Sequence, residues 1–294
     1  MKKQLVYILV VFSLGLALLI AGLRWVLIER TLTHHAFVVQ PHQDVLILGD
    51  SHPACSLLED SSWVHLGKSG EAWYYAVIKG RFIVAQNPHI KTVIIECNAG
   101  QLSSKMEDWI YDDEHMERAF KSYYPIMPLS VQWDLFVHSP ISWMQKFFIA
   151  QKRLLTASIH ADQTNDFKQM EWGGHEVNDR TCADSLKIKN WSGVSSTLVP
   201  FERNVQALES FIVIYIEREE EVKLMRSPVH HSSKPDDVEF VTQFVQERFP
   251  NLVFMDFKNE ITADSLYLDR EHLNEKGAQI FTPFFRKKLN FLSK

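Results

Sequence analysis

The chain has 294 residues, of which 46% are hydrophobic and 23% are charged, a balance typical of a globular protein with a sizeable core. The formal net charge is −5 and the basic residues are scattered, which excludes a broad basic surface of the kind that binds nucleic acid. Three cysteines cannot all pair within one chain and no Cys-x-x-Cys motif occurs, so a disulfide framework is excluded as well.

An apolar segment lies near the start of the chain. Residues 5–23 carry no charge and would span about 30 Å as a helix, the thickness of the hydrocarbon core of a bilayer. No small-residue cleavage site follows, which favours an uncleaved signal anchor over a cleaved signal peptide. We therefore predict a single-pass membrane protein with a transmembrane helix in residues 1–28 and a tether over 29–43. The remainder, 44–294, is expected to form a domain outside the cytoplasm, periplasmic or on the cell surface.

Five short apolar runs have the length and composition of buried strands. They are residues 44–50, 62–67, 92–98, 222–228 and 252–257. Amphipathic helical patterns separate most of these runs and close the chain, at residues 71–87, 201–221, 235–249 and 274–292. This alternation predicts βαβ units, and therefore a three-layer α/β/α fold with a five-stranded parallel sheet.

The interval 99–200 interrupts the alternation because it is too long for a single crossover. It contains five of the eight tryptophans, and helical patterns such as 141–155 alternate with loop signals such as 173–179. We predict a largely helical insertion between the third and fourth strands. Its aromatic residues are expected to form the core of a helical lid, or alternatively to stack on sugar rings.

Polar and small residues follow several of the predicted strands, and ligands of an open parallel sheet bind beyond these carboxyl ends. Ser51 follows the first strand, Gly70 lies in the turn after the second, and Asn98 follows the third. Asp269 and His272 come after the fifth strand, just before the last predicted helix. These residues are therefore expected to meet at one edge of the sheet.

The same residue types supply the parts of serine acyl transfer. His272 would take the proton of the Ser51 hydroxyl as a general base, and Asp269 would orient the imidazole and stabilise its cation. The backbone N–H groups of Ser51 and Gly70, together with the side-chain amide of Asn98, would stabilise the oxyanion.

This spaced set resembles the SGNH hydrolases, also called GDSL-type esterases. Gly49-Asp50-Ser51 matches their first block, and the Gly-Lys-Ser-Gly turn that ends at Gly70 resembles the second. The third block is matched at Asn98, and Asp269-x-x-His272 matches the last block. The resemblance implies a flavodoxin-like sheet, a serine acyl-enzyme, and no metal or cofactor. Members of the family cleave esters or transfer acyl groups, often acetyl groups on sugars.

The resemblance covers roughly residues 44–100 and 222–290. Its third block is degenerate, because Glu96, Cys97 and Ala99 replace the usual neighbours of the asparagine. We therefore predict a serine ester hydrolase or O-acyltransferase that acts on an acylated small molecule, an envelope glycan or a lipid-linked substrate. A transferase would work with a membrane protein that supplies acyl groups. The alternative function is a non-catalytic envelope protein that binds glycan or assists polysaccharide assembly.

Each candidate site residue also has a purely structural interpretation. Ser51 and Asn98 are typical of turns, and Asp269 is typical of the residues before a helix. His52 is an alternative base, although adjacent side chains on a turn usually point apart. A metal site built from His175, His230 and His231 lacks the usual ligand spacing, so no metal is expected.

Overall fold

The computed structural model describes residues 2–27, 39–160, 172–180, 198–233 and 235–292. The chain divides into two compact units. The helical unit comprises Met1–Val38 and Asp113–Glu171, and the α/β unit comprises Val39–Asp112 and Trp172–Lys294. Most of the predicted tether, residues 29–38, lies outside the described residues.

The α/β unit is built on a five-stranded sheet in which every pairing is parallel. Its strands are β1 (Val45–Gly49), β2 (Trp63–Gly67), β3 (Thr92–Glu96), β4 (Glu221–Arg226) and β5 (Val253–Asp256), in the order β2-β1-β3-β4-β5. Every residue of β1 and β3 is buried, because helices cover both faces of the sheet and no face needs polar residues. The predicted α/β class and parallel five-stranded sheet are confirmed.

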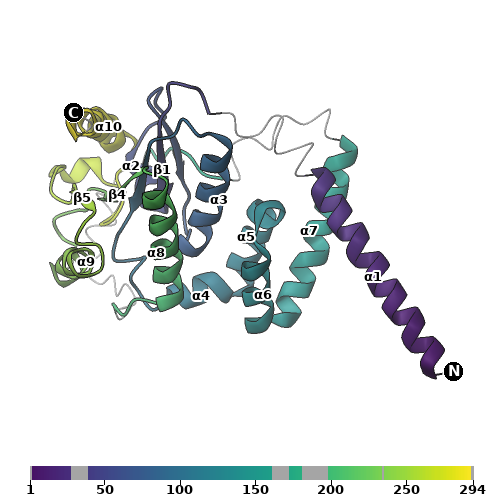
Figure 1. Ribbon diagram of the computed structural model, residues 1–294. Coiled ribbons are helices and arrows are strands. Elements are labelled where there is room, and N and C mark those ends of the chain that lie inside the picture. The colour runs from purple at the N-terminus through teal and green to yellow at the C-terminus, as the bar shows by residue number, and fades with distance from the viewer. Residues whose placement is uncertain (1, 28–38, 161–171, 181–197, 234, 293–294) are drawn as a thin grey trace. The chain divides into compact units, whose positions relative to one another are not determined.

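Helices α3 (Trp73–Gln86) and α8 (Glu202–Glu217) lie side by side on one face of the sheet (Figure 1). Gly80 allows this close packing, since a Cβ there would lie 2.6 Å from Leu48 Cδ1 and 2.8 Å from Phe211 Cε2. Helix α9 (Pro235–Arg248) adjoins α8, and Arg248 Nε donates to Glu209 of α8 at 3.0 Å.

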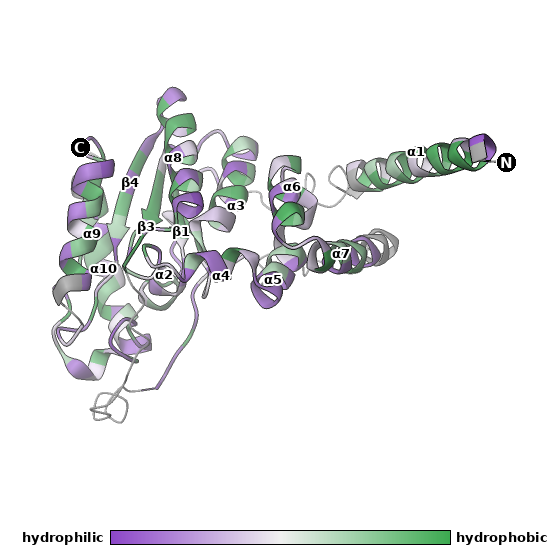
Figure 2. Ribbon diagram, turned by 90° about the horizontal axis from the view of Figure 1, so that it is seen from below, coloured by the Kyte–Doolittle hydropathy of each residue, from purple (hydrophilic) through white to green (hydrophobic). Residues whose placement is uncertain are grey.

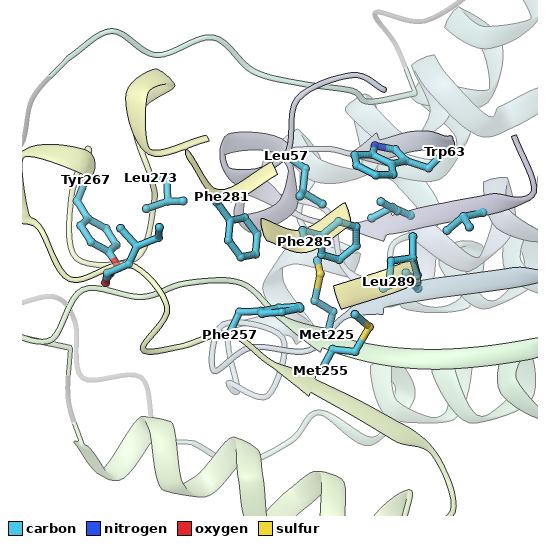
Figure 3. Packing of buried hydrophobic residues seen from close by; sticks show 14 residues of the cluster. Leu57, Trp63, Met225, Met255, Phe257, Tyr267, Leu273, Phe281, Phe285 and Leu289 are labelled. Atoms are coloured by element: carbon cyan, nitrogen blue, oxygen red, sulfur yellow. Dashed lines mark hydrogen bonds between the residues drawn. The ribbon is translucent and has the colours of Figure 1, made fainter. Parts of the chain in front are cut away.

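The opposite face of the sheet packs against α10 (Glu275–Leu292) and the short helix α2 (Ser51–Ser56). Phe281, Phe285 and Leu289 recur every four residues of α10 and are fully or almost fully buried among inward-facing strand residues (Figure 3). Full burial of such a side chain contributes about 1.5–3 kcal/mol. This apolar cluster holds in place the end of the chain that begins just after His272.

Strands β3 and β4 each end two residues earlier than the apolar runs predict, and both differences bear on the site. Strand β3 ends at Glu96, so Asn98 lies in the following loop rather than in the strand. Strand β4 ends at Arg226, and Ser227 begins the loop beyond it. Polar side chains at these two positions therefore lie at the carboxyl edge of the sheet.

The helical unit contains α1 (Lys2–Leu27), α5 (Asp113–Tyr123), α6 (Leu129–His138) and α7 (Pro140–His160), with a short 3-10 helix at Tyr124–Ile126. Residues 3–23 of α1 are long and apolar enough to cross a membrane, and Figure 2 shows this helix as almost uniformly hydrophobic. The edge-on aromatic pair Phe120–Trp143 joins α5 to α7, and Tyr124 of the 3-10 helix makes a similar edge-on contact with Phe147 of α7. A further helix, α4 (Met106–Tyr111), belongs to the α/β unit, which also has a 3-10 helix at Asp264–Leu266.

Candidate active site

Ser51 stands at the junction between strand β1 and helix α2, as the first residue of that helix. Asp50 caps α2, because its Oδ1 accepts the backbone N–H of His52 at 3.0 Å. Gly49 ends the strand where the chain passes close to β3: a Cβ at this position would lie only 2.5 Å from Glu96 Cβ. The Gly-Asp-Ser turn is therefore a tightly packed strand end followed by a capped helix.

The Ser51 hydroxyl is hydrogen-bonded to a histidine that lies 221 positions later in the chain. Ser51 Oγ lies 2.7 Å from His272 Nε2. On the other side of the ring, His272 Nδ1 lies 2.9 Å from both carboxylate oxygens of Asp269. A proton on Nδ1 faces the carboxylate, which leaves Nε2 as an acceptor for the serine hydroxyl. The structure thus joins three of the predicted site residues in one hydrogen-bonded chain.

The turn that carries Asp269 and His272 is fixed by its own hydrogen bonds. Asp269 Oδ1 accepts the backbone N–H groups of Glu271 at 2.8 Å and of His272 at 2.9 Å. Tyr267 and Leu273 form a β-bridge on either side of the turn. Burial alone would raise the pKa of Asp269, but the bonds from His272 and from the backbone N–H groups lower it. The carboxylate therefore remains ionised at neutral pH.

A second aspartate–histidine pair lies beside the first. His52 Nδ1 is 3.0 Å from Asp50 Oδ1, and both side chains are at least nine-tenths buried. The rings of His52 and His272 have centroids 4.8 Å apart. His52 is thus directed at Asp50 rather than at the Ser51 hydroxyl.

The electrostatics of this second pair keep both partners charged. Burial alone would lower the pKa of His52, but the adjacent Asp50 carboxylate, with Glu96 and Glu271 farther away, raises it to about 10. Burial alone would likewise raise the pKa of Asp50, but the charge and hydrogen bonds of His52 and the Asn98 amide hold it well below its usual range. The pair is therefore a buried ion pair throughout the neutral pH range.

Asn98, predicted as an oxyanion donor, lies within this polar network. Its Nδ2 donates to Asp50 Oδ2 at 2.9 Å, and its Oδ1 accepts the backbone N–H of Gln101 at 3.1 Å. Asn98 Nδ2 also lies 3.0 Å from His52 Nδ1, but a protonated ring nitrogen is not an acceptor. One amide hydrogen of Asn98 is therefore bonded to Asp50. The second amide hydrogen is not bonded to the Asp50–His52 ion pair.

Gln101 is a member of the network that the sequence did not point to. Its Nε2 donates to Asp50 Oδ2 at 3.1 Å and to the Glu71 carbonyl at 2.6 Å. Gln101 thereby connects the loop after β3 to the turn after β2. The only signal of Gln101 in the sequence is its position three residues after Asn98. The backbone N–H of Gln101 bonds to the Asn98 side chain and closes this loop.

Gly70 occupies the turn after β2. Glu71 N–H donates to the Lys68 carbonyl at 3.1 Å, which closes a four-residue turn, and Gly70 has a φ of +72°. Gly70 is the third residue of this turn, and a positive φ at the third residue, as in type II turns, favours glycine. Lys68 N–H donates to the Gly49 carbonyl at 3.0 Å, so the turn is attached to the strand end that precedes Ser51.

The stretch 172–180 packs against this turn, which the sequence did not predict. Ser69 donates its backbone N–H and its hydroxyl to Glu176, at 3.1 Å and 2.6 Å. Gly173 has a φ of +117°, and a Cβ there would lie 2.3 Å from the Gly67 carbonyl oxygen. The Gly-Gly pair of this stretch, read only as a loop signal, is what permits the close contact.

Two of the three histidines considered as metal ligands do lie together. His230, His231 and Asp264 place their ligand atoms within 4.8 Å of one another, whereas His175 pairs instead with the first residue of α10. The backbone N–H of Ser232 donates to His230 Nδ1 at 3.1 Å, so neutral His230 carries its proton on Nε2, 3.1 Å from Asp264. A metal ion could bind His230 Nε2 only if that nitrogen carried no proton. The donor pattern therefore fits a histidine–aspartate pair better than a metal centre.

Comparisons with protein-family models and with curated protein sequences found no match to this chain. The chemistry of Ser51 is therefore inferred from the residues around it.

Proposed function

We propose that this protein is a serine ester hydrolase or O-acyltransferase of the SGNH type, acting through an acyl-enzyme on Ser51. The observation that carries the proposal is the chain of hydrogen bonds from Ser51 through His272 to Asp269, at 2.7 Å and 2.9 Å. The strand order β2-β1-β3-β4-β5 supports it, because this is the order of flavodoxin-like folds.

The first half of the reaction acylates the serine. His272 Nε2 takes the hydroxyl proton as Ser51 Oγ attacks the ester carbonyl carbon. Asp269 accepts the Nδ1–H bond, holds the required tautomer and stabilises the imidazolium. When the tetrahedral intermediate collapses, His272 returns the proton to the leaving alcohol and the acyl group stays on Ser51.

The oxyanion needs donors that are in place before the reaction begins. The proposed donors are the backbone N–H groups of Ser51 and Gly70 and the second amide hydrogen of Asn98. The bonds from Asn98 to Asp50 and Gln101 support this role, because they hold the amide in one orientation.

The second half of the reaction releases the acyl group. His272 removes a proton from water, which gives hydrolysis, or from a hydroxyl of an acceptor, which gives transfer, as that oxygen attacks the acyl carbon. When the bond between the acyl carbon and Ser51 Oγ breaks, His272 returns the proton to Oγ. The proposed substrates are an acylated small molecule, an envelope glycan or a lipid-linked substrate. The apolar helix α1 supports a site held close to a membrane. The α/β unit is proposed to lie outside the cytoplasm, and a membrane protein that supplies acyl groups is the proposed partner of a transferase.

A fluorophosphonate probe tests the nucleophile. We expect it to label the wild-type chain and not Ser51→Ala, because phosphonylation requires the activated hydroxyl. Ser210→Ala is the matched control: Ser210 lies on α8, its hydroxyl bonds to the Gln206 carbonyl, and labelling should be retained. A wild-type chain that resists the probe yet binds glycan would support the alternative of a non-catalytic binding protein.

Product analysis then separates hydrolysis from transfer. The wild-type chain is incubated with an activated acetyl ester, with and without an acceptor sugar. Free acetate alone indicates an esterase, and acetylated sugar indicates a transferase.

A further inference from the structure

Helices α6 and α7 of the helical unit expose two stripes of large apolar side chains. On α6, Leu129, Trp133 and Val137 recur every four residues and are 58–75% exposed. On α7, Ile141, Met144 and Phe148 recur at spacings of three and four, and are 43–69% exposed. Residues at these spacings share one face of a helix. We call these six residues the apolar stripes.

The stripes are not the by-product of a helical unit that lacks a core. Other aromatic side chains of α5 to α7 pack on one another, as the Tyr124–Phe147 and Phe136–Trp143 pairs show. Polar side chains of the unit also find partners, since Lys146 of α7 bonds to Glu117 of α5 at 2.8 Å. The unit therefore buries one set of apolar residues and leaves another uncovered among the described residues, and a group of exposed large apolar side chains is typical of an interaction site.

The same unit contains the helix that can cross a membrane. None of residues 3–23 of α1 is buried, and α1 contacts α7. A bilayer that holds α1 is therefore always within reach of the helices attached to it, and tethering of this kind strengthens a second weak contact. The stripes also have suitable chemistry, because tryptophan and phenylalanine favour the boundary between headgroups and acyl chains.

We propose that the apolar stripes are a second membrane contact, in which α6 and α7 lie in the interfacial layer of the lipid bilayer beside the α1 anchor. The contact of α7 with a candidate membrane-spanning helix, within one compact unit, favours lipid over a protein partner. This inference does not depend on the chemistry at Ser51.

Spin-label accessibility in the full chain tests the proposal. The chain is reconstituted in phosphatidylcholine–phosphatidylglycerol nanodiscs, with single nitroxide labels at Leu129→Cys, Trp133→Cys or Phe148→Cys. Cys182→Ser provides the background, because Cys55 and Cys97 are buried and burial raises the pKa of the Cys55 thiol to about 12.

The control label is placed at Glu114→Cys, on the polar surface of α5, where the native side chain is 75% exposed. We expect labels in the stripes to be severalfold more accessible to oxygen than to a water-soluble nickel chelate, relative to the control, since oxygen concentrates in lipid. High access to the nickel chelate at all three stripe positions would overturn the proposal. Low access to both reagents would also overturn it, because the stripes would then be covered by protein, either the α/β unit or a second copy of the chain.

Discussion

Two aspartate–histidine pairs lie beside Ser51, and they differ in burial and in whether the histidine is bonded to the serine hydroxyl. In the pair Asp269–His272, the imidazole is bonded to the carboxylate through Nδ1 and to the serine hydroxyl through Nε2. About a fifth of each side chain is exposed. In the pair Asp50–His52, the ring is almost fully buried and is bonded to the aspartate that caps helix α2. The same two residue types thus form the proposed proton relay in one case and a buried ion pair in the other.

The difference follows from position in the fold rather than from the pairing itself. His272 lies on a turn at the carboxyl edge of the sheet, which is where open parallel sheets bind their ligands. His52 lies in the first turn of a buried helix, where a charge is tolerated only with a partner. We expect changes in the first pair to affect catalysis and changes in the second to affect stability.

The largest expected effect is on turnover, from Asp269→Asn. The amide can donate to Nδ1 and so favour the tautomer that no longer accepts the serine proton. We expect kcat for ester hydrolysis to fall by about 10⁴-fold, with a loss of about 1 kcal/mol in the free energy of unfolding. Steady-state kinetics and urea unfolding in detergent micelles measure the two quantities. A kcat close to that of the wild type would remove Asp269 from the relay.

The next effect is on stability, from Asp50→Asn. This change leaves the His52 imidazolium buried without its counter-charge. We expect the free energy of unfolding to fall by about 3–5 kcal/mol, far more than for Asp269→Asn. The same urea titration provides the measurement, with Asp269→Asn as the matched control. Equal losses in the two variants would contradict the distinction between relay and structural pair.

The smallest effect is a change in the pH dependence of stability, from His52→Gln. The folded-state pKa of His52, about 10, lies above the value of 6.5 for the unperturbed group. The contribution of its charge is therefore fully present below pH 6.5 and is lost as the pH rises through about 10. We expect the wild-type melting temperature to fall more steeply than that of His52→Gln between pH 7 and pH 10. Parallel curves for the two chains would show that His52 does not carry this dependence.

The sheet and the convergence of distant residues were predictable because both follow from local patterns. Continuous apolar runs separated by amphipathic helices indicate parallel strands, whose carboxyl ends share one edge. Ser51, Asp269 and His272 each sit just beyond such an end or just before the last helix, so their meeting needs no further information. Their catalytic roles remain predictions.

The partners within the site were harder to predict, because they depend on long-range packing that has no periodic signal. Nothing in the order of residues indicates that Asn98 bonds to Asp50, or that Glu176 reaches Ser69 across 107 positions. The strand ends were also less certain than the strands themselves: β3 stops at Glu96 instead of extending to Asn98. Apolar composition marks a buried segment but does not mark where its hydrogen-bonded ladder ends.

The separation of Ser51 from His272 also has a consequence for biosynthesis. Synthesis of the 221 residues from His52 through His272, at about 5 to 20 residues per second, takes roughly 10 to 45 seconds. During that time the nascent chain carries the serine without its base, and Phe281 and Phe285 of α10, which pack in the core, come later still in the chain. Under the proposed chemistry, Ser51 of a chain still being translated cannot take an acyl group from a substrate. A chain truncated before α10 would likewise show no acyl transfer.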